Sequence, residues 1–304
     1  MKVVLALFCG VLRLWADGHG PAFGLSTATL GAGDASLGTA MMWRSGVYML
    51  APYFSYGVTG NFQVSVSSPF HLNHGNHPVG RFTGLMPGDP ETEVLAAWRF
   101  HHNLTGVGTR NESTLYVGSS VSTQHEPRTD GPPFHRMPGF YLGAATGHIS
   151  RRFYVWSGVG YQRFASVGGD HPNPTLLGSL VLGWRPPFLD KEFPKPDGRF
   201  FWETTGESLG PGWRYEPSLI PDTPSAPPVC DSHHCVTPPG PTGIVAVSKS
   251  QAVFSGPTFL WTWRGVALQS GILFALWRGP SGVQPVDRYR AVVGVSYFFL
   301  KGRK

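Results

Sequence analysis

Residues 290–299, RAVVGVSYFF, decide the fold class because they alternate strictly between two unlike faces. One face carries only apolar side chains: Ala291, Val293, Val295, Tyr297 and Phe299. The other face is small or polar until its aromatic end: Arg290, Val292, Gly294, Ser296 and Phe298. A period of two is typical of a β-strand with unlike faces, and about ten residues is the length with which a tilted strand crosses a bilayer. The stretch therefore predicts the last strand of a transmembrane barrel, which closes against a first strand.

The composition agrees with a chain whose exterior faces lipid. Of the 304 residues only 14% are charged and 13% are aromatic, whereas soluble domains carry about 25% charged residues. After the N-terminal region, no run approaches the ~18 consecutive apolar residues of a transmembrane helix. Together these features favour an all-β fold with a single transmembrane antiparallel β-barrel. The alternative is a soluble all-β protein with many turns, since the chain has 40 Gly and 28 Pro.

Residues 1–18 have the pattern of a secretory signal peptide. Lys2 is the charged start, residues 3–12 form a short apolar run, and Ala16 and Gly18 provide small side chains around a cleavage site. Cleavage would remove Cys9 and leave Cys230 and Cys235, a pair suited to an oxidising compartment. We therefore expect residues 19–304 to form the barrel in the bacterial outer membrane, inserted by the barrel-assembly machinery.

The alternation predicts twelve strands. They span residues 35–44, 47–57, 61–70, 92–101, 111–123, 138–149, 152–164, 175–185, 199–208, 252–263, 266–277 and 290–299. Outer-membrane barrels have short periplasmic turns and longer external loops, and the second, fourth, sixth and tenth connections are short. A long Pro-rich external loop is expected at about residues 209–250. Two connections break the pattern: the first, Ser45-Gly46, is too short for an external loop, and the eighth, residues 186–198, is too long for a turn.

Several stretches resemble one family of bacterial outer-membrane proteins. They are PAFGLSTATLGAGDASLGTAMMWRSG (residues 21–46), APYFSYGVTGNFQVSVSSP (51–69), GVGTRNESTLYVGSS (106–120), YVWSGVGYQRF (154–164), VLGWRPPF (181–188) and FSGPTFLW (254–261). The chain is similar here to the MetA-pathway of phenol degradation family. The resemblance implies an outer-membrane β-barrel that transports small molecules, often aromatic or otherwise apolar. It brings no catalytic residues.

Charged side chains on the faces opposite the apolar residues are expected in the lumen, because charge on the lipid face is costly. They are Glu93, Arg99, His101, Glu203, Glu207 and Arg290. They would line a substrate path, or else form ion pairs that only hold the barrel. Arg99 or Arg290 is expected to pair with a glutamate in the lumen.

Two external loops contain residue types that bind metals. One loop contains His71, His74 and His77, and the other contains Cys230, His233, His234 and Cys235. Thiolates and imidazoles are ligands for Zn or Cu. A disulfide between Cys230 and Cys235 with solvated histidines is the favoured alternative, because the compartment is oxidising. Solvated polar loops likewise explain the histidines of the first loop.

No motif indicates an enzyme, since the chain has no GxSxG, no Walker loop and no HExxH. The net charge of +6 comes from basic residues scattered along the chain, apart from the tail at residues 301–304, so we expect no nucleic-acid partner. No cofactor is expected, and the partners are outer-membrane lipid and a small-molecule solute. The sequence thus predicts a channel or passive transporter, and the alternative is a non-conducting barrel whose external loops bind a ligand or a metal.

Overall fold

The computed structural model describes residues 20–44, 47–72, 91–122, 138–165, 174–189, 195–210, 212–215, 229–230, 235–236, 244–247, 250–279 and 288–300. The predicted signal peptide and most of the predicted Pro-rich loop lie outside these residues. Among the residues described, no helix is long and apolar enough to cross a membrane.

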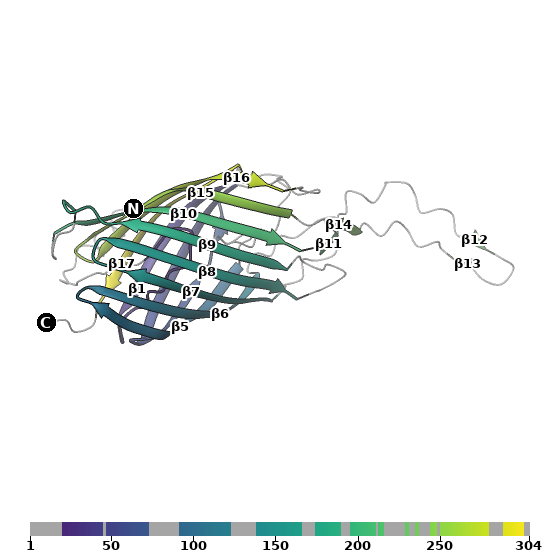
Figure 1. Ribbon diagram of the computed structural model, residues 1–304. Coiled ribbons are helices and arrows are strands. Elements are labelled where there is room, and N and C mark those ends of the chain that lie inside the picture. Colours follow the sequence, from purple (N-terminus) through teal and green to yellow (C-terminus); the bar gives the residue numbers. More distant parts are fainter. Residues whose placement is uncertain are drawn as a thin grey trace, which may run out of the picture.

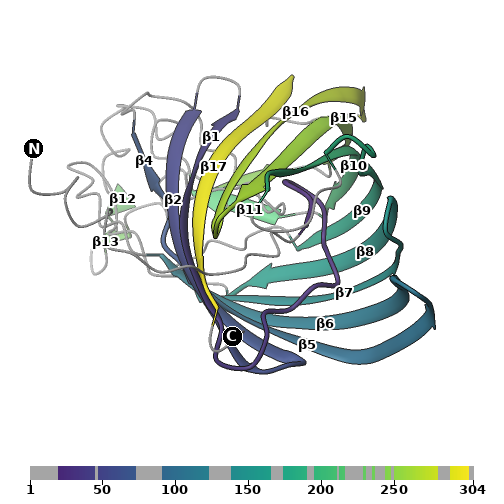
Figure 2. The ribbon, with the colours of Figure 1, turned by 90° about the vertical axis from the view of Figure 1, so that its left-hand side faces the viewer.

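The main structure is one closed antiparallel sheet (Figures 1 and 2). Its strand order is β1-β17-β16-β15-β10-β9-β8-β7-β6-β5-β3-β2, and it closes because β1 pairs with both β17 and β2. Twelve strands thus surround the lumen, as predicted: β1 (Ala35–Arg44), β2 (Val47–Thr59), β3 (Phe62–Ser67), β5 (Glu91–Gly106), β6 (Thr109–Ser122), β7 (Gly139–Ile149), β8 (Phe153–Phe164), β9 (Thr175–Trp184), β10 (Asp197–Leu209), β15 (Ser250–Trp263), β16 (Val266–Arg278) and β17 (Tyr289–Phe299).

Five short strands complete the described structure. β4 (Phe70–His71) pairs with the start of β2 and begins at the last residue of the third predicted strand. The other four form two small ladders within the long connection between β10 and β15: β11 (Gly212–Tyr215) with β14 (Ile244–Val247), and β12 (Val229–Cys230) with β13 (Cys235–Val236).

The turns at the end near the C-terminus are short, whereas the connection that carries β11 and β14 lies at the opposite end (Figure 1). Between β15 and β16 the turn is Arg264-Gly265, and both residues have positive φ, 49° and 85°. This is the geometry of a two-residue hairpin turn whose twist matches the strands. At the same end, Arg185 forms an ion pair with Asp197 across the longer β9–β10 connection, and Arg199 of β10 pairs with the same carboxylate.

The two faces of β17 and β10 have the predicted character. On β17, Val293 and Val295 are exposed, and Arg290, Val292 and Ser296 are buried. On β10, Phe200 and Trp202 are exposed, whereas Glu203 is 0% exposed. A closed ring of exposed apolar side chains is stable in the hydrocarbon region of a bilayer, and barrels of this kind occur in bacterial outer membranes.

Strand β5 follows the prediction as far as Arg99 and departs from it at His101. Trp98 is 52% exposed on the outer face, and Arg99 points inward opposite Thr114. The register between β5 and β6 shifts between Arg99 and His101. A bulge adds one residue to one strand and so reverses the faces beyond it. His101 therefore lies outward, opposite Ser113, and the prediction that it lines the lumen is wrong.

Leu180 lies in the middle of β9, and its side chain is exposed on the outer surface of the barrel. A substitution there tests whether this face contacts lipid. Leu180→Arg should lower the free energy of unfolding in lipid vesicles by about 2–4 kcal/mol, the cost of a basic side chain near the bilayer midplane. Urea titration of the folded band on unheated gels measures the change. Leu180→Phe is the control and should unfold like the original protein; an unchanged titration for Leu180→Arg would contradict the assignment of this face to lipid.

Candidate functional site: the lumen and its internal segment

Residues 20–34, which precede the first strand, lie inside the barrel (Figure 2). We call them the internal segment. At one end Gln269 Nε2 of β16 donates a hydrogen bond of 3.3 Å to the carbonyl oxygen of Gly20. Towards the other end, the backbone N–H of Leu30 donates to Gln63 Oε1 of β3 at 2.8 Å. The segment therefore follows the inner wall from β16 to β3 and takes up part of the lumen.

Glu203 of β10 holds the start of the internal segment. Its carboxylate accepts hydrogen bonds from three consecutive backbone N–H groups, those of Ala22 at 2.6 Å, Phe23 at 2.8 Å and Gly24 at 2.7 Å. Thr258 Oγ1 of β15 donates a fourth, at 2.5 Å. A buried carboxylate is tolerated only where donors replace its water, so the segment and Glu203 satisfy each other.

The wall and the segment approach so closely that several positions require glycine, among them Gly24 of the segment and Gly158 of β8. A Cβ on Gly24 would come within 2.4 Å of Val181 Cγ2 of β9. A Cβ on Gly158 of β8 would come within 2.9 Å of Leu25 Cβ. Contacts this short do not occur between real side chains, so these glycines make room for the segment against β8 and β9.

A second carboxylate, Glu112 of β6, holds the middle of the internal segment and is also 0% exposed. It accepts a hydrogen bond from Thr27 Oγ1 at 3.1 Å. It forms ion pairs with Arg99 at 2.9 Å and Arg110 at 2.9 Å, and His102 Nε2 is 3.7 Å away. The bulge in β5 turns His102, rather than His101, towards this group.

Thr27 is hydrogen-bonded on three sides, which fixes the path of the chain. Besides its bond to Glu112, its Oγ1 accepts from Trp156 Nε1 of β8 at 3.1 Å. Its carbonyl oxygen accepts from Thr114 Oγ1 at 2.7 Å. Next to it, the Tyr116 hydroxyl donates to the carbonyl oxygen of Ser26. The segment thus has a specific seat in the lumen.

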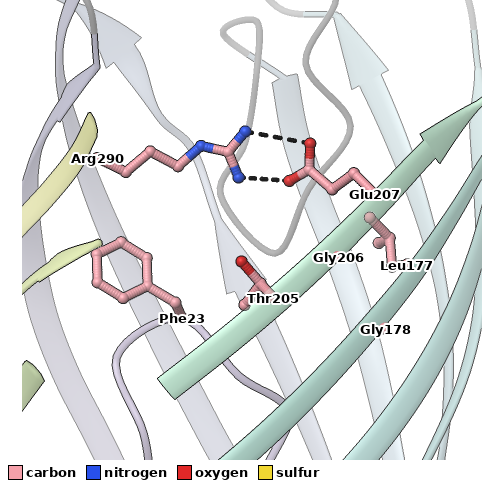
Figure 3. A pocket seen from close by; sticks show the side chains of 7 residues that line it. All are labelled: Phe23, Leu177, Gly178, Thr205, Gly206, Glu207 and Arg290. Carbon is pink, nitrogen blue, oxygen red and sulfur yellow. Dashed lines mark hydrogen bonds and ion pairs between the residues drawn. The ribbon is translucent and has the colours of Figure 1, made fainter. Parts of the chain in front are cut away.

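A buried ion pair lies closer to the end with long connections. Arg290 of β17 and Glu207 of β10 form a two-point ion pair, and both side chains are 3% exposed. The Arg290 guanidinium also stacks on the ring of Phe254, 3.7 Å from its centroid. The pair borders a small pocket with a cavity volume of about 10 Å³, which Thr205 and Leu177 also line (Figure 3). Phe23 of the internal segment forms one wall of this pocket.

The structure brings four of the predicted lumen residues into pairs or clusters. Glu207 pairs with Arg290, Glu203 binds the internal segment, and Arg99 binds Glu112. Glu93 lies on the same face of β5 as Arg99. Whether these residues form a substrate path remains a proposal.

Sequence reasoning missed Glu112 and the role of the internal segment. A signal for Glu112 was present, because Glu112, Thr114, Tyr116 and Ser120 alternate with Leu115 and Val117 along β6. The internal segment has no strand or helix period, so its position depends on partners that are distant in sequence, such as Glu203.

The proposed metal loops lie mostly outside the described residues. This holds for His74, His77, His233 and His234, whereas His71 belongs to β4. Cys230 and Cys235 are directly opposite each other in the β12–β13 ladder, and cross-strand neighbours have Cα separations of about 4.5–5.5 Å, within the range of a disulfide. A disulfide remains the favoured proposal. No cluster of three or more metal-binding side chains occurs among the described residues.

Comparison with solved structures supports the fold. The COG4313 outer membrane channel from Pseudomonas putida F1 is similar with a TM-score of 0.55 and 10% identity, over 92% of this chain and 100% of that chain. The NanC porin gives a TM-score of 0.43 at 9% identity, over 86% of this chain and 98% of its own. The KdgM porin gives 0.41 at 10% identity, over 87% and 99%. The first likeness shows a shared barrel fold.

No protein-family model and no curated protein matches the sequence. Membership of the MetA-pathway of phenol degradation family therefore remains a prediction. The more general prediction, that the chain forms a barrel of the outer-membrane type, is confirmed. The sheet is closed, and its fold is similar to that of the solved COG4313 channel.

Glu203→Ala should release the start of the internal segment, because three backbone N–H groups lose a charged acceptor. Hydrogen bonds to charged groups contribute about 1.5–3 kcal/mol each. We expect the amides of residues 22–24 to exchange with deuterium at least about tenfold faster. Mass spectrometry of the protein in nanodiscs measures the exchange. Phe200→Leu, on the lipid face of the same strand, is the control and should leave the exchange unchanged; slow exchange in Glu203→Ala would contradict the assigned role.

Arg290→Met should destabilise the barrel by about 3–5 kcal/mol, because it leaves Glu207 buried without its cation. Replacing both partners, Glu207→Leu with Arg290→Met, should recover most of the lost stability, since neither side chain then carries a charge. Urea unfolding in lipid vesicles compares the two variants. If the double variant is as unstable as Arg290→Met, the burial of the charge is not the cause.

Proposed function

We propose that this chain is an outer-membrane channel or passive transporter for small solutes. The observation that carries the proposal is the closed barrel whose lumen contains charged groups and a pocket beside the internal segment. Arg290 and Glu207 compensate each other there, as do Arg99 and Glu112, so fixed polar groups line an interior that apolar strand faces enclose. The shared fold of a solved outer-membrane channel is consistent with this role.

The finer proposal is that the solutes are aromatic or otherwise apolar. It rests on the motif resemblance and on apolar side chains at the pocket, Phe23 and Leu177. The proposed partners are outer-membrane lipid, the solute and, for insertion, the barrel-assembly machinery. We propose no enzymatic activity, because the sequence has no GxSxG, Walker or HExxH motif.

A second function, a non-conducting barrel with ligand-binding external loops, is favoured by one observation. The internal segment occupies part of the lumen and is fastened by Glu203 and Glu112. If the segment fills the cross-section in the membrane, solutes cannot pass while it remains seated.

Purified protein in planar lipid bilayers separates the two functions. We expect stepwise single-channel conductance, with larger steps in Glu203→Ala because part of the internal segment leaves the wall. Phe200→Leu is the control and should conduct like the original protein. A silent original protein together with a conducting Glu203→Ala would favour the non-conducting barrel, and silence of both would reject the channel.

A further inference from the structure

Aromatic side chains form a row on the outer surface, near the end of the barrel with short turns. Phe153 of β8 is directly opposite Trp184 of β9, and Trp184 is opposite Phe200 of β10. Phe200 is in turn opposite Phe259 of β15, and their ring centroids are 4.8 Å apart. We call these four residues the aromatic belt. Such belts lie where the hydrocarbon of a bilayer meets the headgroups, so this one marks the depth at which headgroups begin.

Two strand ends next to the belt couple an exposed aromatic ring to an arginine. At the end of β15, Arg264 follows Trp263, and its guanidinium lies over the indole ring, 4.9 Å from the centroid. At the start of β8, Arg152 directly precedes Phe153 of the belt, and both side chains are exposed. An arginine beside an aromatic ring keeps its charge in the headgroup layer while the ring contacts acyl chains.

The exposed charge at this end is basic throughout the residues that the structure describes. The exposed basic side chains, which we call the basic rim, are Arg151, Arg152, Lys195 and Arg264. The acidic side chains described at this end are buried or half-buried: Asp34, Glu112 and Asp197. A surface with this sign attracts anions and repels cations.

We propose that the basic rim binds the headgroups of anionic phospholipids, one at Arg152 and one at Arg264. The two arginines stand at the ends of β8 and β15, three strand spacings or about 14 Å apart, which is too far for one headgroup. A guanidinium forms paired hydrogen bonds with phosphate oxygens, and the aromatic belt contacts the acyl chains below. A zwitterionic headgroup has the same phosphate, but its ammonium group is repelled by the surrounding basic side chains.

The leaflet follows from the topology. In barrels of this kind the short turns face the periplasm, so the bound lipids belong to the periplasmic leaflet. The inference goes beyond the channel proposal, because it names a lipid class and two residues on the outside of the barrel. It holds whether or not the lumen conducts.

Native mass spectrometry of the full chain, folded in a non-ionic detergent, tests the sites by titration with phosphatidylglycerol or phosphatidylcholine of identical acyl chains. We expect two phosphatidylglycerol molecules to bind about fivefold more tightly than phosphatidylcholine, the factor that corresponds to one basic side chain at an anionic surface. Arg152→Gln and Arg264→Gln should each remove one of the two preferred sites. The double variant should bind both lipids alike.

Three variants serve as controls. Arg152→Lys and Arg264→Lys keep the charge and should retain both sites. Arg163→Gln removes an exposed arginine from the opposite end of β8 and should also retain both. Heat-modifiable gel mobility verifies that each variant is folded. A double Gln variant that still prefers phosphatidylglycerol, or loss of a site in Arg163→Gln, would overturn the assignment to the basic rim.

Salt dependence tests the original protein without any substitution. Raising the ammonium acetate concentration from 0.1 M to 0.5 M shortens the range of exposed charges, so the preference for phosphatidylglycerol should fall towards equality with phosphatidylcholine. Equal affinity for the two lipids at 0.1 M, or a preference that salt leaves unchanged, would contradict the proposal. Neither result bears on conductance, so the lipid sites and the channel stand or fall separately.

Discussion

Backbone N–H and C=O groups in the hydrocarbon region of a bilayer have no water to bond with, so every strand must be paired on both sides. The pairing of β1 with both β17 and β2 meets this requirement and closes the barrel. Closure also fixes an inside and an outside for each strand. The burial of Glu203 and the exposure of Trp202, one residue apart, both follow from it.

The same requirement recurs inside the barrel for the internal segment. Only its last residues, Gly33 and Asp34, form backbone hydrogen bonds with a strand that the structure describes, at Gly57 of β2. Side chains of the wall take the place of a ladder: Glu203 accepts three N–H groups, Ser179 Oγ accepts that of Leu25 at 3.2 Å, and Gln63 accepts that of Leu30. The segment is therefore fastened by side chains on several strands. Seating it in this way places Phe23 beside the lumen pocket.

Charge in the lumen serves two purposes. Glu207 and Arg290 neutralise each other, whereas Glu112 pairs with both Arg99 and Arg110, so that cluster keeps one excess positive charge. Glu203 instead depends on dipolar donors from the internal segment and Thr258. Loss of the segment would leave the buried carboxylate with Thr258 as its remaining described donor, which couples the electrostatics of the lumen to the position of residues 20–34.

The sequence by itself determined the strands and their faces, because a period of two along residues such as 290–299 is a local property of the chain. It placed Glu203, Glu207, Arg99 and Arg290 inside the barrel for the same reason. Only the tertiary structure decided that Arg290 meets Glu207, 83 residues away, since such pairs depend on the stagger between strands. It also decided the orientation of His101, because a single bulge reverses every face beyond it. The path of residues 20–34 could not be read locally, because its hydrogen-bond partners lie on strands that come together only when the barrel closes.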